Sequence, residues 1–206
     1  MFAVATRDER DIAYCGAENG AISAWSLSEG TRIWELPSAH EGAVIALAVK
    51  GDLLCSAGHD RKVHLWSCAD RPTLVRTIEP AEGRPAALAL DPRGPLLAIA
   101  MQVMSNQQAA GEIVKGLQSK QPVDRDRAPT GGATLLYRLD HLDWPAARLD
   151  GHDAGVSDLS FDPQGRYLAT LGDDDRLTIW DTPDAATLAA QVEMLCRRNL
   201  RQKEWD

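Results

Sequence analysis

Serine, histidine and aspartate side chains, which together can build a nucleophilic catalytic site, occur in two parts of the chain. One group contains His40, Ser56 and Asp60, and the other contains His152, Thr170 and Asp174. A catalytic hydroxyl must be exposed beside an oxyanion site, whereas Ser56 and Thr170 lie in the middle of apolar strand-like segments. A catalytic interpretation would also require two active sites. We therefore expect no catalytic residue and no enzyme activity.

A metal site is the second chemical hypothesis, because His59, Asp60 and His64 lie close together in the sequence. His64 lies on an expected strand whose neighbours Val63 and Leu65 face the other way. No set of two histidines and a carboxylate with metal-ligand spacing recurs elsewhere in the sequence. Four cysteines lack any CxxC pair: Cys15, Cys55, Cys68 and Cys196. We expect no metal, no cofactor and no disulfide framework, and we interpret the cysteines as reduced thiols of a cytoplasmic protein.

The charge of the chain bears on its partners. The 206 residues carry 22 basic and 30 acidic side chains, for a net charge of −8, and the isoelectric point is near 5.1. An acidic surface repels phosphate backbones, so we expect no nucleic-acid partner. No apolar run reaches the roughly 18 residues that a membrane span needs, and no signal peptide follows Met1. We therefore expect no membrane association.

Tryptophan recurs at regular places along the chain. The segments that contain Trp25, Trp66 and Trp180 resemble one another, and Tyr137 replaces Trp in a fourth copy. The intervals are 41, 71 and 43 residues, and they become nearly equal once an insertion of about 28 residues is removed. A period in the low forties predicts stacked or radial repeats. Within each repeat, short apolar runs separated by turn residues predict strands, and helical periodicity begins only near Ala185.

These repeats resemble the WD-repeat family of β-propellers. The best copy carries both marker pairs of that family, Gly151-His152 and Trp180-Asp181, and a second copy runs from His40 to Trp66-Ser67. The resemblance covers roughly residues 1–183. It implies an all-β fold of four WD-type repeats, each a propeller blade of four antiparallel strands.

The repeat boundaries divide the chain into four expected blades. They cover residues 1–37, 38–80, 81–150 and 151–183, with an insertion at about 102–132 in the third. Residues 184–206 are expected to form a short C-terminal helix and a tail, since Asp184 is a candidate cap and alanine is abundant after it. The tail from Cys196 to Trp205 resembles the ends of bacterial WD-repeat proteins, which suggests a bacterial source.

In WD repeats a His, a Ser or Thr, an Asp and the Trp form a hydrogen-bonded tetrad inside the blade. The resemblance assigns two such tetrads here: His40, Ser56, Asp60 and Trp66, and His152, Thr170, Asp174 and Trp180. The first repeat offers only Cys15, Asn19 and Trp25 for the last three roles, and the third has no tetrad. Burying these polar groups is costly unless each finds a partner, and a closed network satisfies them together.

The family also implies where partners bind. Its usual docking surface is the channel mouth and the face that carries the His-bearing loops, and the 102–132 insertion opens on that face. Candidate partner-binding residues are Glu41, His59, Arg84, Glu112, Arg125, Arg127 and Asp173. An insertion of this length is often functional, but it is equally well explained as a solvated loop without a role.

The function implied by the resemblance is a non-catalytic scaffold for protein–protein interaction. The alternative is an enzyme or ligand-binding propeller whose pocket at the channel mouth is completed by the 102–132 insertion. Against this alternative, the insertion offers Glu112, Asp124 and Asp126 but no histidine.

The number of blades predicts incomplete closure. Propellers of this family usually close with seven or eight blades, and an array of four would leave one apolar face bare at each end. A second copy, a different chain or strained closure of the four blades alone could cover these faces. We favour the first two, and of these a partner or parent chain.

Overall fold

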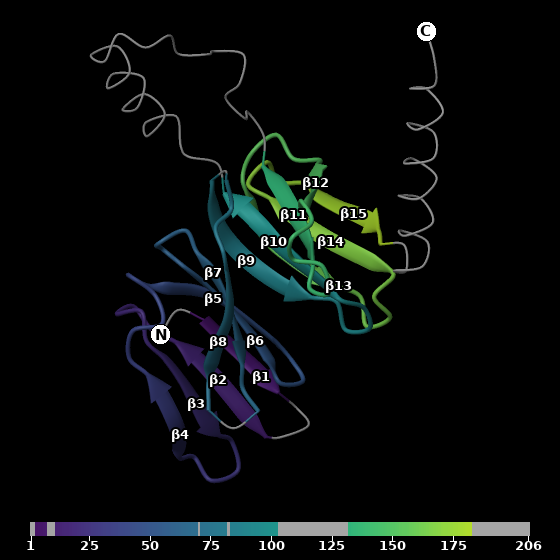
Figure 1. Cartoon of the computed structure of the whole chain (residues 1–206). Coiled ribbons are helices and arrows are strands. Elements are labelled where there is room, and N and C mark those ends of the chain that lie inside the picture. Colours follow the sequence, from purple (N-terminus) through teal and green to yellow (C-terminus); the bar gives the residue numbers. More distant parts are fainter. Residues whose placement is uncertain (1–2, 8–10, 70, 82, 103–131, 183–206) are drawn as a thin grey trace, which may run out of the picture.

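The chain folds into four separate antiparallel sheets, which we call blades 1 to 4 in chain order (Figure 1). The computed structural model describes residues 3–7, 11–69, 71–81, 83–102 and 132–182. Blade 1 contains β1 (Ala3–Arg7), β2 (Ile12–Gly16), β3 (Ile22–Ser26) and β4 (Arg32–Leu36). Blade 2 contains β5 (Val44–Lys50), β6 (Leu53–Gly58), β7 (Val63–Ser67) and β8 (Thr73–Ile78).

In the second half of the array, blade 3 again has four strands, whereas blade 4 has three within the described residues, one fewer than the four expected of each blade. Blade 3 contains β9 (Arg84–Leu90), β10 (Leu96–Gln102), β11 (Ala133–Arg138) and β12 (Ala147–Asp150). Blade 4 contains β13 (Val156–Phe161), β14 (Tyr167–Gly172) and β15 (Leu177–Asp181). Within each blade the strands pair antiparallel in chain order. The all-β prediction is thus confirmed over the described residues, and the expected C-terminal helix and most of the insertion lie outside them.

Tight turns join several of the paired strands, and their residues explain why. In the β13–β14 turn, the Asp162 carboxylate accepts hydrogen bonds from the backbone N–H groups of Arg166 and Tyr167. Gly165 has φ +66°, a conformation that L side chains rarely adopt. The pattern Asp-Pro-Gln-Gly therefore forms the hairpin turn that its sequence predicts.

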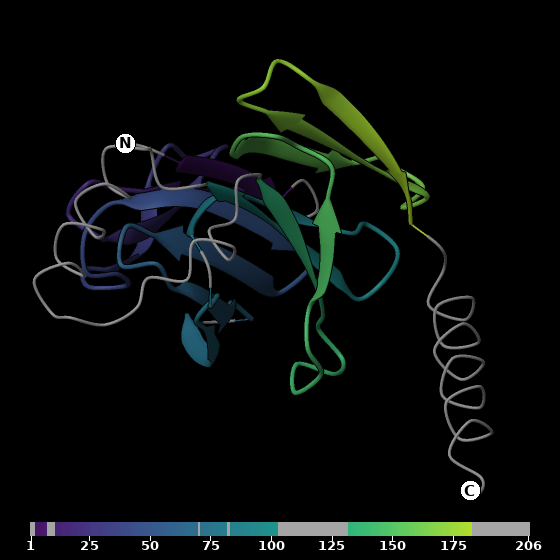
Figure 2. The ribbon, with the colours of Figure 1, turned by 90° about the horizontal axis from the view of Figure 1, so that it is seen from above.

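The blades stack side by side through their first strands. β1 contacts β5, β5 contacts β9, and β9 contacts β13, so the order of blades in space is their order in the chain (Figures 1 and 2). One buried apolar cluster lies at each of the three junctions. They are centred on Tyr14 and Trp66, on Leu65 and Leu97, and on Ala98 and Leu168.

Position in the array decides how deeply a strand is buried. Both faces of β6 and β10 are covered by neighbouring blades, so these strands are buried almost throughout. In contrast, β14 alternates between exposed and buried residues because only one of its faces has a neighbour. Figure 2 shows blade 4, in green and yellow, at one end of the array. Within the described residues, no helix is long and apolar enough to cross a membrane.

Candidate functional site

The second blade brings together the four side chains of its expected tetrad. The Trp66 indole N–H donates to Ser56 Oγ at 2.9 Å, and Ser56 Oγ lies 2.7 Å from His40 Nε2. On the other side of the ring, His40 Nδ1 lies 3.0 Å from both carboxylate oxygens of Asp60. The Ser56 hydroxyl accepts from the indole and donates to Nε2, so the neutral imidazole donates from Nδ1 to the carboxylate.

The fourth blade repeats this network with threonine as the hydroxyl. Trp180 Nε1 donates to Thr170 Oγ1 at 3.0 Å, and Thr170 Oγ1 lies 2.8 Å from His152 Nε2. His152 Nδ1 lies 3.0 Å from Asp174 Oδ1. The same geometry at two sites favours a shared structural role over a single catalytic one.

Burial separates these networks from a nucleophilic site. Ser56 and Thr170 are both 0% exposed, and each hydroxyl is already bonded to an indole and an imidazole. A substrate could therefore reach neither oxygen without opening the blade. The arrangement can hold strands and loops in place, but it offers no accessible nucleophile.

The ionisable groups of the second blade have shifted pKa values with physical causes. Burial lowers the pKa of His40, and its attraction to Asp60 only partly offsets that effect. Burial alone would raise the pKa of Asp60. Backbone N–H groups of Lys62 and Glu41, together with His40, outweigh it and place that pKa below its ordinary value. The tetrad is therefore a neutral imidazole beside an ionised carboxylate at neutral pH.

The fourth blade follows the same electrostatic pattern at its carboxylate. Burial would raise the pKa of Asp174, but hydrogen bonds from the backbone of Asp153 and Arg176 and from the His152 ring lower it to about 2. Asp174 thus stays ionised over the whole physiological pH range.

Each tetrad aspartate also joins two surface loops. Asp60 accepts hydrogen bonds from the backbone N–H of Glu41, in the β4–β5 loop, and of Lys62, in the β6–β7 turn. Asp174 does the same for Asp153 and Arg176, which in addition form an ion pair with each other at 2.8 Å. We call the surface made by residues 39–43, 59–62, 151–155 and 173–176 the loop face.

The loop face presents several of the predicted partner-binding residues. Glu41, His59 and Asp173 are exposed on it. The backbone N–H groups of His59 and Asp173 donate to the neighbouring loop, at Ala43 and Gly155, and so hold both turns in place. Arg84 is half-buried at the start of β9. The other predicted contacts lie outside the described residues: Glu112, Arg125 and Arg127.

Blade 1 departs from the tetrad that its repeat partly matches. The Trp25 indole donates to Ser23 Oγ on its own strand, at 2.9 Å and near the surface. Asn19 still fills the turn position, because its side chain accepts from the backbone N–H of Ala21 as Asp60 does from Lys62. Without the histidine, the first blade keeps the turn but forms a different bond at the tryptophan.

Blade 3 has apolar side chains at positions where blades 2 and 4 have the polar groups of the tetrad. Ile99 lies at the strand position of Ser56, since it pairs with Leu135 as Ser56 pairs with His64. Thr134 Oγ1 is buried without a hydrogen-bond partner among the described residues. Burial alone raises the pKa of Tyr137, which replaces the tryptophan. This blade is therefore held by its apolar clusters.

A histidine that the sequence analysis did not assign to the tetrad lies against it. His64 and His40 have ring centroids 4.5 Å apart, and His64 Nδ1 lies 2.9 Å from Thr77 Oγ1. Ligand atoms of His40, Asp60 and His64 all lie within 4.8 Å of one another. Both ring nitrogens of His40 are already engaged, so a cation would have to displace a tetrad bond. Because His64 pairs with Ser56 across neighbouring strands, the expected strand register could have predicted that His64 lies beside the tetrad.

The comparisons with known proteins agree with this geometry. The family described as "WD domain, G-beta repeat" matches residues 30–67 and 144–181, and each match ends one residue after the tryptophan of a tetrad. Together with the tetrads and the blades, these matches support the WD-repeat propeller family for this chain.

Two curated relatives carry the same repeat. WD repeat-containing protein 90 of Mus musculus is 23% identical over 172 residues, which cover 82% of this chain and 8% of the relative. WD-40 repeat-containing protein MSI4 of Arabidopsis thaliana is 22% identical over 163 residues, which cover 79% of this chain and 24% of the relative. The chain thus spans a quarter or less of these relatives. The bacterial source expected from the tail stays a prediction.

Solved structures agree on the fold. A chain of the computationally designed Ika4 protein superposes with a TM-score of 0.61 at 18% identity, over 88% of this chain and 90% of that one. A chain of the mitotic checkpoint complex gives the same TM-score and identity, over 88% of this chain and 49% of that one. WD-repeat proteins generally act as scaffolds for protein interaction and are generally not enzymes.

Proposed function

We propose that this chain is a non-catalytic scaffold that binds a protein partner through its loop face. The observation that carries the proposal is the double role of Asp60 and Asp174. Each buried network ends in a carboxylate that fixes two loops, and those loops expose charged side chains. A rigid surface loses little conformational entropy on binding, which favours affinity without any chemistry.

The charge of the loop face indicates what kind of partner fits. Glu41, Asp153 and Asp173 are exposed on it beside Arg176 and Lys62. A mixed surface of this kind suits a protein with complementary charges of both signs. The free thiols of Cys15 and Cys55 support a reducing, cytoplasmic location.

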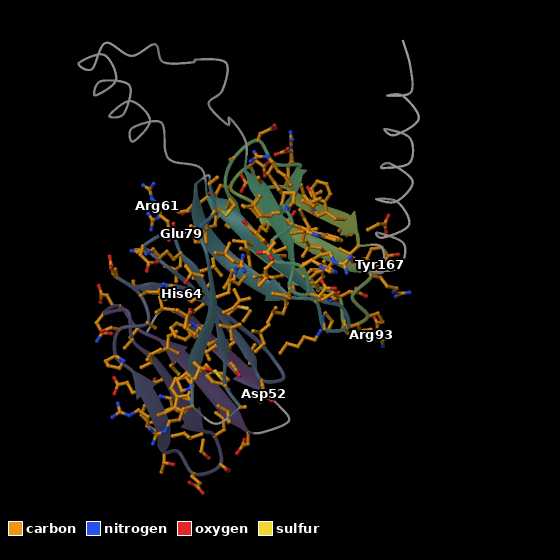
Figure 3. All side chains as sticks on the ribbon, viewed as in Figure 1. Asp52, Arg61, His64, Glu79, Arg93 and Tyr167 are labelled. Carbon is orange, nitrogen blue, oxygen red and sulfur yellow. The ribbon has the colours of Figure 1, made fainter. Side chains whose placement is uncertain are left out.

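The test is recovery of a partner from the source organism with matched variants. The triple variant Glu41→Ala, His59→Ala and Asp173→Ala removes exposed side chains of the loop face and leaves both tetrads intact. The control, Arg93→Ala with Gln164→Ala, changes exposed residues of turns at the other end of the strands. Figure 3 shows Arg93 and Asp52 away from Arg61 and Glu79, which lie near the loop face.

We expect mass spectrometry to identify a protein that the wild type and the control retain and the triple variant loses. Equal recovery by all three chains would contradict binding through the loop face. Turnover of a substrate by the purified chain would contradict the non-catalytic role.

A further inference from the structure

The end of blade 4 exposes apolar side chains at positions that are buried in blades 1 and 2. Leu177 and Ile179 on β15 are 65% and 63% exposed. Since Trp25, Trp66 and Trp180 occupy the same strand position, the equivalent residues can be read from the register. They are at most 2% exposed: Ile22, Ala24, Val63 and Leu65. Tyr167 and Leu171 extend the exposed face of blade 4, which we call the tail face, along β14.

Blade 1, at the other end of the array, also exposes apolar side chains whose equivalents in other blades are buried. Val4 on β1 is 51% exposed, although it pairs with Cys15 at the hydroxyl position of the repeat. The equivalent residues of the other three blades are 6–9% exposed: Leu47, Leu88 and Leu159. Trp25 is 37% exposed, whereas Trp66 is 6% exposed. We call the surface around Val4 and Trp25 the head face.

The head face and the tail face correspond to the two surfaces that meet wherever consecutive blades of this chain pack together. Trp66 packs with Tyr14 of the preceding blade, and Trp180 packs with Ala98 of the preceding blade. Each blade therefore turns its tryptophan side toward the blade before it. Within the described residues, no blade covers the tryptophan side of blade 1 at the head face, and none covers the opposite side of blade 4 at the tail face.

We propose that the tail face of one copy of this chain binds the head face of a second copy, and that two such junctions close a ring of two chains. This assembly goes beyond the proposed function and does not depend on which protein the loop face binds. Each junction continues the internal interface, where Leu65 and Leu88, the equivalents of Ile179 and Val4, lie in one buried cluster. It also covers apolar side chains that soluble monomers rarely expose together.

The number of copies follows from the size of propellers. A head-to-tail contact either closes into a ring or grows into a filament. Propellers typically close with 4–8 blades around a channel. One four-blade chain also falls within that range, but both of its end faces are exposed in the structure, so it does not close on itself. Two copies fall within the range, whereas three copies would exceed it. The ring of two is therefore the closed assembly that leaves neither face bare.

The experiment measures the mass of the purified full chain by sedimentation velocity between about 1 and 100 μM, with four variants. Ile179→Asp places a charge on the tail face, and Val4→Lys places the opposite charge on the head face. Val75→Asp is the matched control, because Val75 is 60% exposed on β8 of blade 2, away from both end faces. Far-UV circular dichroism verifies that each variant is folded, and Leu177→Asp is a second tail-face variant.

We expect a two-chain mass for the wild type and for Val75→Asp, and a one-chain mass for each end-face variant alone. An equimolar mixture of Ile179→Asp and Val4→Lys should return to the two-chain mass, because one junction is then native and the other pairs opposite charges. A wild-type monomer at every concentration overturns the proposal, as does a dimer that persists in both end-face variants. A dimer of Val4→Lys alone would mean that tail faces pair with each other, and it also overturns the proposal.

Discussion

Replacing Ser56 with alanine tests the role of the blade 2 tetrad. The substitution removes the oxygen that accepts from Trp66 Nε1 at 2.9 Å and that lies 2.7 Å from His40 Nε2. Both partners are buried, so an indole N–H and an imidazole nitrogen lose their hydrogen bonds at once. Leaving a buried polar group without a partner costs about 1–3 kcal/mol. With some relaxation, we expect Ser56→Ala to lower the free energy of unfolding by about 2–4 kcal/mol.

Urea unfolding followed by circular dichroism measures this change. The control is Ser38→Ala, since Ser38 is exposed in the turn before His40, and we expect a change under about 0.5 kcal/mol. A domain of this kind has a total stability of about 5–15 kcal/mol, so the expected loss is easily resolved. Equal midpoints for the two variants would refute the argument that the network stabilises blade 2.

Three further predictions concern the same networks. Gly58→Ala should destabilise by about 1–3 kcal/mol in urea unfolding, because its new Cβ would meet His40 and Asp60; an unchanged midpoint would contradict that packing. Trp66→Phe should cost at least about 1 kcal/mol and Trp25→Phe under about 0.5 kcal/mol, since only Trp66 donates inside a buried tetrad; equal costs would be inconsistent with the different bonds in blades 1 and 2. Burial lowers the pKa values of His40 and His64, so the stability that they contribute as neutral rings is complete above pH 6.5 and is lost as the pH falls. His64→Gln should therefore flatten the fall in urea midpoint between pH 7 and 5, and an unchanged slope would rule out this role of His64.

Much of the fold follows from the spacing of tryptophan and turn residues. The period places each strand, and the pattern of His, hydroxyl, Asp and Trp selects the side chains that the structure brings together in blades 2 and 4. The fold class and the family were predictable because the same pattern of residues occurs several times along the sequence.

Other features depend on which partners and neighbours a side chain has in the folded blade, and a sequence pattern does not show these. In blade 1, the Trp25 indole donates to Ser23 on its own strand and not to the expected partner Cys15, and a hydroxyl is a better acceptor than a thiol. His64 approaches His40 because strand register places it opposite Ser56. The strand Leu177–Asp181 is as apolar as Val63–Ser67, so only the structure shows that one is covered and the other is bare.

The central claim is that the tetrad histidines are structural and closed to solvent. The most direct measurement is an NMR spectrum of the chain labelled with ¹⁵N-histidine, recorded in water at neutral pH. The chain has five histidines, and we predict slowly exchanging Nδ1–H signals from His40 and His152, each lost when Asp60 or Asp174 is replaced by alanine. Rapid exchange of the Nδ1–H protons at both rings would contradict the claim and would instead favour accessible histidines.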